Sequence, residues 1–345
     1  DRNLVVSVAS GLSKPVPLSA GVPQGSVIGP SPKSFIAYTS DAQTIFNQHS
    51  MPHHMFADDM QGARSAKPVN ASEITYTLEC CMFDILSWCR SMRLQLNPGK
   101  TELLWFGTPA NLSKVPMNIR SINLGGQTVH PSTSICTLGV VFDCYLSMKQ
   151  HVSRVAQSCY FHLRRIRSIR DRLDRETACH LVCALILTRL DYCNAMLADL
   201  PQATLAPLQR VLHAAARIVM DLRPYDHVTP ALRELHWLPI QHRISFKLGS
   251  LTHSGLYGNS PEYLRNLLRP VADVPARASL RSASVRDLVV PATRLRMSER
   301  AFSVAGPKSW NLLPSNLKLI TDRNRFRQGL KTHLYRQAYD TNVST

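Results

Sequence analysis

Two adjacent carboxylates, Asp58 and Asp59, stand within the stretch HHMFADDMQGA at residues 53–63, which contains no lysine or arginine. Neighbouring like charges repel each other, so a purely structural site would normally pair or separate them. Two interpretations are open for such a pair. It forms the bend of a solvated β-turn, where Asp is favoured for backbone reasons, or it holds a divalent metal ion that prefers hard oxygen ligands. Taken alone, the pair favours the turn, so its surroundings must decide.

The segments on either side of the pair predict a β-hairpin with the two carboxylates at its tip. HHMF and MQGAR are β-prone, and a helix that would cover the hairpin follows at residues 70–92. Asn70 and Glu73 are spaced as a capping box at its start. The predicted buried face of this helix consists of Ile74, Leu78, Cys81, Met82, Ile85, Leu86 and Cys89.

Exposed carboxylates at a hairpin tip can hold Mg²⁺, which takes one or two protein carboxylates together with phosphate oxygens of a substrate. Two such ions can stabilise both the attacking and the leaving oxygen of an in-line phosphoryl displacement. The pattern therefore indicates the chemistry of a polymerase or a nuclease.

The remaining elements follow from periodicity and turn residues. Residues 205–222 show the clearest apolar helical face, and the pattern is helical from about residue 149 onward. Before that point we expect a strand at 4–11, a tight turn at 22–26, a helix start within 29–46, a turn at 97–99, a strand at 100–107, a hairpin at 121–130 and a strand at 136–143.

Positive charge is concentrated in the second half of the chain. The 345 residues carry a net charge of +17, with 44% hydrophobic residues, as expected for a globular protein. Residues 1–150 hold 11 Lys and Arg against 9 Asp and Glu, whereas residues 151–345 hold 29 against 14. The basic residues of the runs at 164–175 and 323–331 are mostly Arg, whose planar guanidinium suits phosphate. They indicate contact with a nucleic-acid backbone, and a solvated helix face is the alternative.

The cysteines do not form a disulfide framework. There are nine, at irregular spacing, which favours reduced thiols. Cys179, His180 and Cys183 have the spacing of half a zinc site, but no second pair completes a tetrahedral set, so buried core thiols are favoured. The longest apolar run, at 181–187, is too short to cross a bilayer. We therefore expect an intracellular protein without a membrane partner, in either the nucleus or the cytoplasm.

Four stretches occur in an order and spacing that point to one family: GVPQGSVIGP at 21–30, FADD at 56–59, LQLNPGKTELLWFG at 94–107 and LGVVFD at 138–143. They resemble the later palm motifs of reverse transcriptases from LINE-type, jockey-like retrotransposons without long terminal repeats. The resemblance implies an α+β fold. A partial polymerase palm, an antiparallel sheet with helices, would occupy residues 1–145, a mostly α-helical thumb-like region 146–250, and a basic C-terminal region 251–345.

The resemblance also implies roles for individual residues. Asp58 would be the principal metal ligand and Asp59 the lesser one, both catalytic, with Mg²⁺ as cofactor and Mn²⁺ as a substitute. The partners would be an RNA template, a DNA primer and deoxynucleoside triphosphates. The residues implied in nucleotide or template binding are Gln24, Gly25, Phe56 and Lys100, and those implied in primer binding are Leu138 and Gly139.

One feature of the family has no counterpart. Its polymerases use another metal-binding aspartate on a strand upstream of the Pro-Gln-Gly motif, and Asp1 is the sole carboxylate among residues 1–21. Pro32 and Lys33 also stand where the family has an apolar run, and Met60 where a small hydroxyl residue is usual. We therefore expect a C-terminal fragment of a reverse transcriptase with little or no polymerase activity by itself. A non-catalytic nucleic-acid-binding remnant that uses the basic helical half is the alternative, and a remnant that never folds stably is a third.

Overall fold

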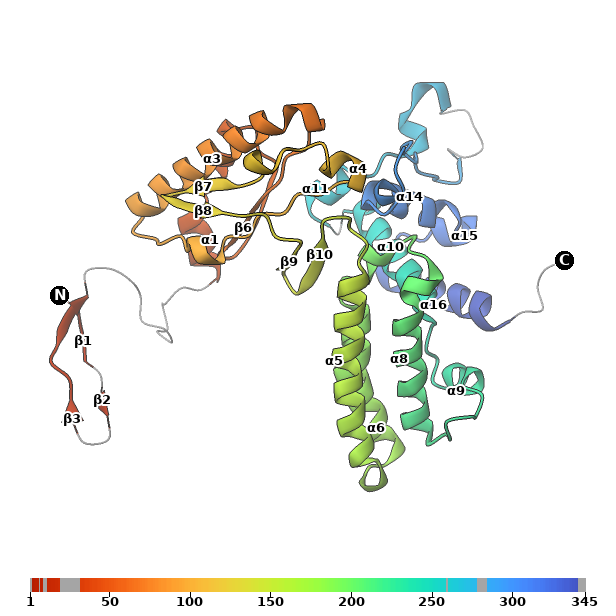
Figure 1. The fold of residues 1–345 in the computed structure, drawn as a ribbon. Coiled ribbons are helices and arrows are strands. Elements are labelled where there is room, and N and C mark those ends of the chain that lie inside the picture. Colours follow the sequence, from red (N-terminus) through yellow and green to blue (C-terminus); the bar gives the residue numbers. More distant parts are fainter. Residues whose placement is uncertain are drawn as a thin grey trace. The chain divides into compact units, whose positions relative to one another are not determined.

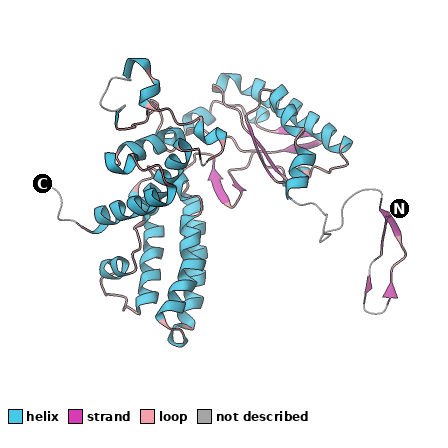
Figure 2. Ribbon diagram, turned by 180° about the vertical axis from the view of Figure 1, so that it is seen from behind, coloured by secondary structure: helices cyan, strands magenta, loops and turns pink. Residues whose placement is uncertain are grey.

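The computed structural model describes residues 2–5, 7–8, 11–18, 32–258, 260–277 and 284–340 (Figure 1). The chain divides into two compact units, Asp1–Ile135 with Asp143–Tyr145, and Cys136–Phe142 with Leu146–Thr345. The fold is mixed, as predicted, because helices accompany small two-stranded antiparallel sheets. Figure 2 shows that helices make up most of the second unit.

The first unit begins with a two-stranded ribbon. β1 (Arg2–Leu4) pairs with β4 (Val16–Leu18), and β2 (Ser7–Val8) pairs with β3 (Gly11–Leu12). The single strand predicted at 4–11 is confirmed in part, because Leu4 and Ser7–Val8 are strand residues, but Gly11 belongs to the next strand, β3. The predicted helix start is confirmed in α1 (Pro32–Thr39), and after a break α2 (Ala42–Gln48) follows. The turn predicted at 22–26 lies outside the described residues.

Helix α3 (Ala71–Ser91) is the centre of the first unit. One of its sides packs on α2 and on the hairpin of β5 (His53–Phe56) and β6 (Asp59–Gly62). Another side packs on the hairpin of β7 (Ile122–Leu124) and β8 (Gln127–Val129). The apolar face predicted for residues 70–92 is confirmed, because Ile74 is buried and the other members of the face belong to these two cores. The same helix therefore supports both hairpins.

The capping box predicted at Asn70 and Glu73 is absent. Asn70 belongs to a 3-10 turn, η1 (Pro68–Asn70), and its side chain makes no capping hydrogen bond. Its φ and ψ are −97° and 15°, away from the extended conformation that a capping residue normally adopts. The hairpin predicted at 121–130 is confirmed, and Gly125 and Gly126 supply the two positive φ angles of its turn.

Two other strand predictions need correction. Within 100–107 only Leu103 pairs, in an isolated parallel bridge to Pro131, which has no N–H to extend a ladder. The turn before it forms η2 (Pro98–Lys100), and the short helices α4 (Pro109–Leu112) and η3 (Met117–Ile119) follow. The strand predicted at 136–143 is instead the hairpin of β9 (Ser134–Thr137) and β10 (Val140–Asp143).

The second unit is built on long helices, and α5 (Lys149–Ser168) and α8 (Gln202–Met220) lie side by side (Figure 1). Between them in sequence, α6 (Arg175–Val182) continues through the π-helix η5 (Cys183–Leu187) into α7 (Thr188–Asp191). The predicted apolar face of α8 is confirmed by the burial of Leu205, Leu208, Leu212, Ala215 and Val219. The shorter elements here are η4 (Arg170–Arg172), η6 (Asn194–Leu197) and α9 (Thr229–Glu234).

Helix α10 (Ile240–Leu256) contributes to both hydrophobic cores of the second unit, the second of which surrounds Trp310, Phe326 and Leu330. None of the helices in the described part of the chain is both long and apolar enough to cross a membrane. The remaining elements are α11 (Glu262–Arg265), η7 (Val271–Asp273), η8 (Pro275–Arg277), α13 (Arg296–Glu299), α14 (Phe302–Asn311), α15 (Ser315–Lys318) and α16 (Arg323–Tyr339).

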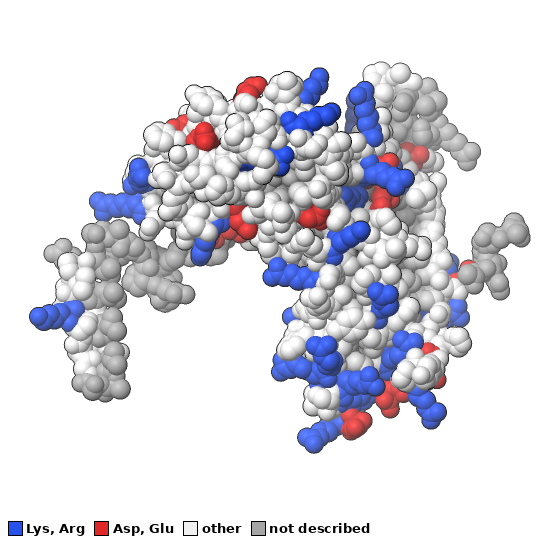
Figure 3. Space-filling model, viewed as in Figure 1, with Lys and Arg blue, Asp and Glu red and all other residues white. Residues whose placement is uncertain are grey.

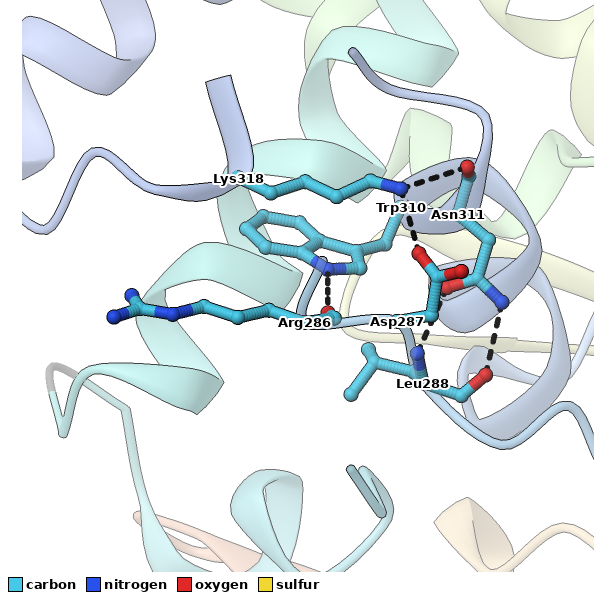
Figure 4. A network of polar contacts seen from close by, with 6 residues as sticks. All are labelled: Arg286, Asp287, Leu288, Trp310, Asn311 and Lys318. Carbon is cyan, nitrogen blue, oxygen red and sulfur yellow. Dashed lines mark hydrogen bonds and ion pairs between the residues drawn. The ribbon is translucent and has the colours of Figure 1, made fainter. Parts of the chain in front are cut away.

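A polar network fastens the segment 286–288 to α14 and α15 (Figure 4). The side chain of Asn311 accepts from the backbone N–H of Leu288 and donates to its carbonyl, both at 2.8 Å. The Lys318 ammonium donates to Asp287 at 2.7 Å and to the carbonyl of Asn311 at 2.9 Å. These contacts satisfy backbone groups that would otherwise be buried without partners.

Candidate functional site

The hairpin predicted around the two aspartates is confirmed. The antiparallel register pairs Phe56 with Asp59, so Ala57 and Asp58 form a two-residue turn. Ala57 has a φ of +53°, an uncommon value for a residue with a Cβ. Asp58 and Asp59 are both exposed, and Phe56 is 59% exposed.

The two faces of the hairpin differ. Met55 and Met60 pair across the strands, and both pack on the core that includes Phe46. Successive side chains of a strand point to opposite faces, so Phe56 and Asp59 share the face that is turned away from this core. The hairpin thus has an apolar face that anchors it and an opposite face that presents a carboxylate and an aromatic ring.

Close contacts hold the base of the hairpin against α2. The rings of Phe46 and His53 stack, with centroids 4.8 Å apart and planes at 14°. A Cβ added at Gly62 would lie 3.3 Å from Cγ of Met51, so β6 packs tightly at this position. The strands that carry the aspartates are therefore fixed by packing, while the tip stays exposed.

The donor set at the tip fits a hard cation but is small. Within the described ranges no group of three or more His, Cys, Asp or Glu side chains is placed to hold a metal ion. Asp58 and Asp59 offer carboxylate oxygens, which suit Mg²⁺ or Mn²⁺. The other coordination positions of such an ion would be filled by water, by phosphate oxygens of a substrate or by other ligands.

Lys100, Gln24 and Gly25 are also implied in nucleotide binding, and of these three the structure describes Lys100. Lys100 is exposed at the end of η2, a turn in which Asn97 accepts from the N–H of Gly99 at 3.0 Å. The turn thus presents the ammonium group to solvent. Gln24 and Gly25 lie outside the described residues.

Leu138 and Gly139 occupy the turn of the β9–β10 hairpin, with φ angles of +47° and +79°. The hydroxyl of Tyr192 donates to the carbonyl of Leu138 at 2.6 Å, which fixes the turn. A cavity of about 340 Å³ next to the turn is lined by Gly139 and Tyr192 and by the basic side chains of Arg154 and Arg189. Gly139, one of the two residues predicted to contact the primer, therefore lies beside two cations.

Sequence reasoning did not identify Arg154 and Arg189. Arg154 shares the cavity with His151, Val155 and Ser158, and the spacing of these four residues marks one face of α5. That pattern was available as a signal. Burial lowers the pKa of His151, with Arg154 adding to the effect, so this histidine favours its neutral form.

The arginine run at 164–175 serves two different purposes. Arg170 donates to the carbonyls of Ile218 at 2.7 Å and Val219 at 3.1 Å, so it caps the end of α8. Arg164, Arg165 and Arg167 are exposed instead. Figure 3 shows Lys and Arg gathered at this end of α5 and α6. These three exposed arginines are called the α5 cluster below.

Comparisons with known proteins agree with the motifs. Over 262 residues the chain is 25% identical to a Drosophila melanogaster protein named "Probable RNA-directed DNA polymerase from transposon BS". The aligned stretch covers 71% of this chain and 27% of that protein. This chain is thus similar to an RNA-directed DNA polymerase of a mobile element. The "RNA-directed DNA polymerase from mobile element jockey" of the same species is 24% identical over 161 residues, 46% of this chain and 17% of that protein.

The resemblance to jockey-like reverse transcriptases is thereby confirmed. The chain spans about a quarter or less of the length of these two relatives. No known protein-family profile and no solved structure matches it. The roles of single residues stay predictions.

Proposed function

We propose that this chain forms part of an RNA-directed DNA polymerase, with the β5–β6 hairpin tip as its metal site. The observation that carries the proposal is the placement of Asp58 and Asp59, which are exposed at a tip whose opposite face is packed on α2 and α3. The family relationship supports the reading of this tip as a polymerase motif. Asp58 would be the principal ligand of Mg²⁺ or Mn²⁺ and Asp59 the lesser one.

A divalent ion bound at the tip would supply positive charge to the oxygens of a phosphate substrate. The residues of the chain would position that substrate. The exposed ring of Phe56 lies on the same face as Asp59 and would stack against the template or the incoming nucleotide. Lys100 would contact the triphosphate, and Gln24 with Gly25 would shape the nucleotide pocket.

The primer end would be held at the β9–β10 turn. Tyr192 fixes the backbone of Leu138, and Gly139 lines the cavity beside the turn, where a sugar or a phosphate of the primer would lie. Arg154 and Arg189 line the adjacent cavity and would neutralise a phosphate of the primer strand. The partners proposed for the whole polymerase are an RNA template, a DNA primer and deoxynucleoside triphosphates.

Two carboxylates supply only part of a two-ion site, so we expect this chain to have little or no polymerase activity by itself. A primer-extension assay with an RNA template, a DNA primer and Mg²⁺ or Mn²⁺ tests this. The expected result is no extension above background for the chain. Extension that Asp58→Ala abolishes would show that the chain is catalytically sufficient and would refute this expectation.

A second function, nucleic-acid binding without catalysis, is favoured by the α5 cluster. Exposed arginines bind phosphates of any sequence, so affinity should fall steeply with salt concentration. A variant with Arg164→Gln, Arg165→Gln and Arg167→Gln should show a shallower salt dependence of RNA binding. Asp58→Ala should leave that dependence unchanged, and equal slopes for the triple variant and the parent chain would contradict the assignment.

A further inference from the structure

A cavity of about 580 Å³ lies in the second unit, lined mainly by α10 and α16. Its volume falls within the range of small-molecule sites, which is roughly 300–1,000 Å³. Residues from η5, α7 and η6 and from the segment 235–238 complete the wall. None of these residues belongs to the hairpin tip or to the β9–β10 turn.

Five cationic side chains line this cavity. Arg323, Arg327 and Lys331 line it at intervals of four residues, so they form one row along α16. Arg243 and Lys247 line it from α10 with the same spacing. These five side chains are called the cationic rows below.

The negative charge that faces the cationic rows is small. Asp191 is the one carboxylate among the residues that line the cavity, and its Oδ1 lies 3.3 Å from Nε of Arg243. In the described part of the chain, no carboxylate lies within ion-pair distance of the other four cations. Cations held together without counter-charges repel each other, and a bound anion would relieve that repulsion.

The interior of the cavity offers neutral polar groups and an aromatic ring. Oδ1 of Asn194 and Oγ of Ser250 are buried without a hydrogen-bond partner, and Asn194 is only 2% exposed. The amide nitrogen of Asn194 donates to Asp191 at 3.4 Å, so its oxygen is the atom left to accept. Buried polar atoms without partners are costly and are normally satisfied by water or a ligand. The ring of Phe246 also lines the cavity, with the guanidinium of Arg327 5.7 Å from its centroid.

We propose that this cavity binds one nucleotide unit. The base enters beside Phe246 and hydrogen-bonds with Asn194 and Ser250, and the phosphates lie along the cationic rows. An aromatic ring next to cations is the usual arrangement for binding an unpaired nucleotide. The same chemistry is offered by a free nucleoside triphosphate and by an unpaired nucleotide of a single strand. Binding here does not require a divalent ion, because the charges that hold the phosphates are side chains.

The test is a calorimetric titration of the full chain with ATP in the presence of EDTA, which removes any metal-dependent binding at the hairpin tip. Arg323→Gln combined with Arg327→Gln should weaken ATP binding at least about tenfold, the loss expected for one charge-assisted hydrogen bond. The matched control is Arg325→Gln combined with Arg336→Gln. These arginines are exposed on the same helix and do not line the cavity. Equal weakening by both pairs would show general electrostatic attraction and overturn the proposal.

The base is tested separately with tripolyphosphate, which carries the charge without the ring. ATP should bind about tenfold more tightly, because its base can stack on the aromatic side chain and tripolyphosphate has no base. Ser250→Leu should fill the cavity and remove this preference, and circular dichroism would establish that the variant is folded. Tripolyphosphate binding as tightly as ATP would overturn the assignment of the cavity to a nucleotide.

The source of the nucleotide is decided by competition. A 5′-phosphorylated oligothymidylate that displaces ATP would identify an unpaired nucleotide of a strand, and failure to displace it would identify a free nucleotide. Asp58→Ala should leave all of these affinities unchanged. If ATP binds in EDTA but no metal binds at the hairpin tip, the polymerase proposal fails and the nucleotide proposal stands. If a metal binds at the tip but ATP does not bind in EDTA, the nucleotide proposal fails and the polymerase proposal stands.

Discussion

The ammonium group of Lys318 lies 2.7 Å from Oδ1 of Asp287, with 4% of the lysine side chain and 20% of the aspartate side chain exposed. Removing one partner of a buried pair leaves an uncompensated charge, which costs about 3–5 kcal/mol. Lys318→Met should therefore lower the free energy of unfolding of the second unit by about this amount. Urea unfolding followed by circular dichroism measures it.

The double variant of the same pair is the control. Lys318→Met combined with Asp287→Leu removes both charges, and buried pairs replaced by apolar residues are often neutral in stability. The double variant should therefore be more stable than Lys318→Met alone. A double variant that is less stable than the single one would show that the backbone contact of Lys318 to Asn311 matters more than the ion pair.

His253 predicts a dependence of stability on pH. It is fully buried, its Nε2 donates to the carbonyl of Ile320 at 2.9 Å, and its ring stacks on Phe326. Burial lowers its pKa, Arg323 adds to this, and the bond to Ile320 and the charge of Asp322 oppose it. The unfolded chain therefore binds a proton near the usual histidine pKa of about 6.5, whereas the folded chain does so only at lower pH.

Stability should thus fall as pH drops from about 6.5 toward the lowered pKa of the folded state. Unfolding measured at several pH values should show a smaller acid loss in His253→Gln, which keeps a donor but does not titrate. The buried His151 and the half-buried His242 also have lowered pKa values and would keep part of the slope. His227→Gln, at an exposed position, should leave the slope unchanged, and a slope unaffected by His253→Gln would refute the assignment.

A substitution of Tyr192 tests whether the β9–β10 turn holds the primer end. Tyr192→Phe removes only the hydroxyl that donates to Leu138, and such a hydrogen bond contributes about 0.5–1.5 kcal/mol to stability. If this turn holds the primer end, binding of a recessed RNA–DNA duplex measured by fluorescence anisotropy should also weaken. Tyr225→Phe, at a 96% exposed position, is the matched control. Unchanged duplex binding in Tyr192→Phe would show that the turn does not hold the primer end.

The helices that carry the cores were predictable, because an apolar face repeats every three to four residues. Residues 74–89 and 205–219 show this pattern, and both faces are buried as predicted. The hairpin tip at Asp58 was also predictable, since two β-prone segments flank it. In each case the signal is local in the sequence.

The errors arose where local signals were incomplete. LGVVFD was predicted as part of one strand, but Leu138 and Gly139 form a turn. Leu138 adopts a positive φ there, and an apolar leucine is not a residue that predicts a turn. The segment 100–107 has strand composition, yet its one described β-bridge is to a proline. The cavity of the cationic rows was missed because residues from several helices form it, and only the fold brings them together.

The hairpin tip is proposed to hold a divalent ion for polymerase chemistry. The most direct test measures Mn²⁺ affinity by electron paramagnetic resonance in the presence of a deoxynucleoside triphosphate, for the parent chain and for Asp58→Asn. The matched control is Glu73→Gln on α3, which also removes one exposed acid. We expect Mn²⁺ affinity to fall at least about tenfold in Asp58→Asn, as for the loss of a charged ligand, and to stay unchanged in Glu73→Gln. Equal Mn²⁺ affinity in the parent chain and in Asp58→Asn would contradict the account.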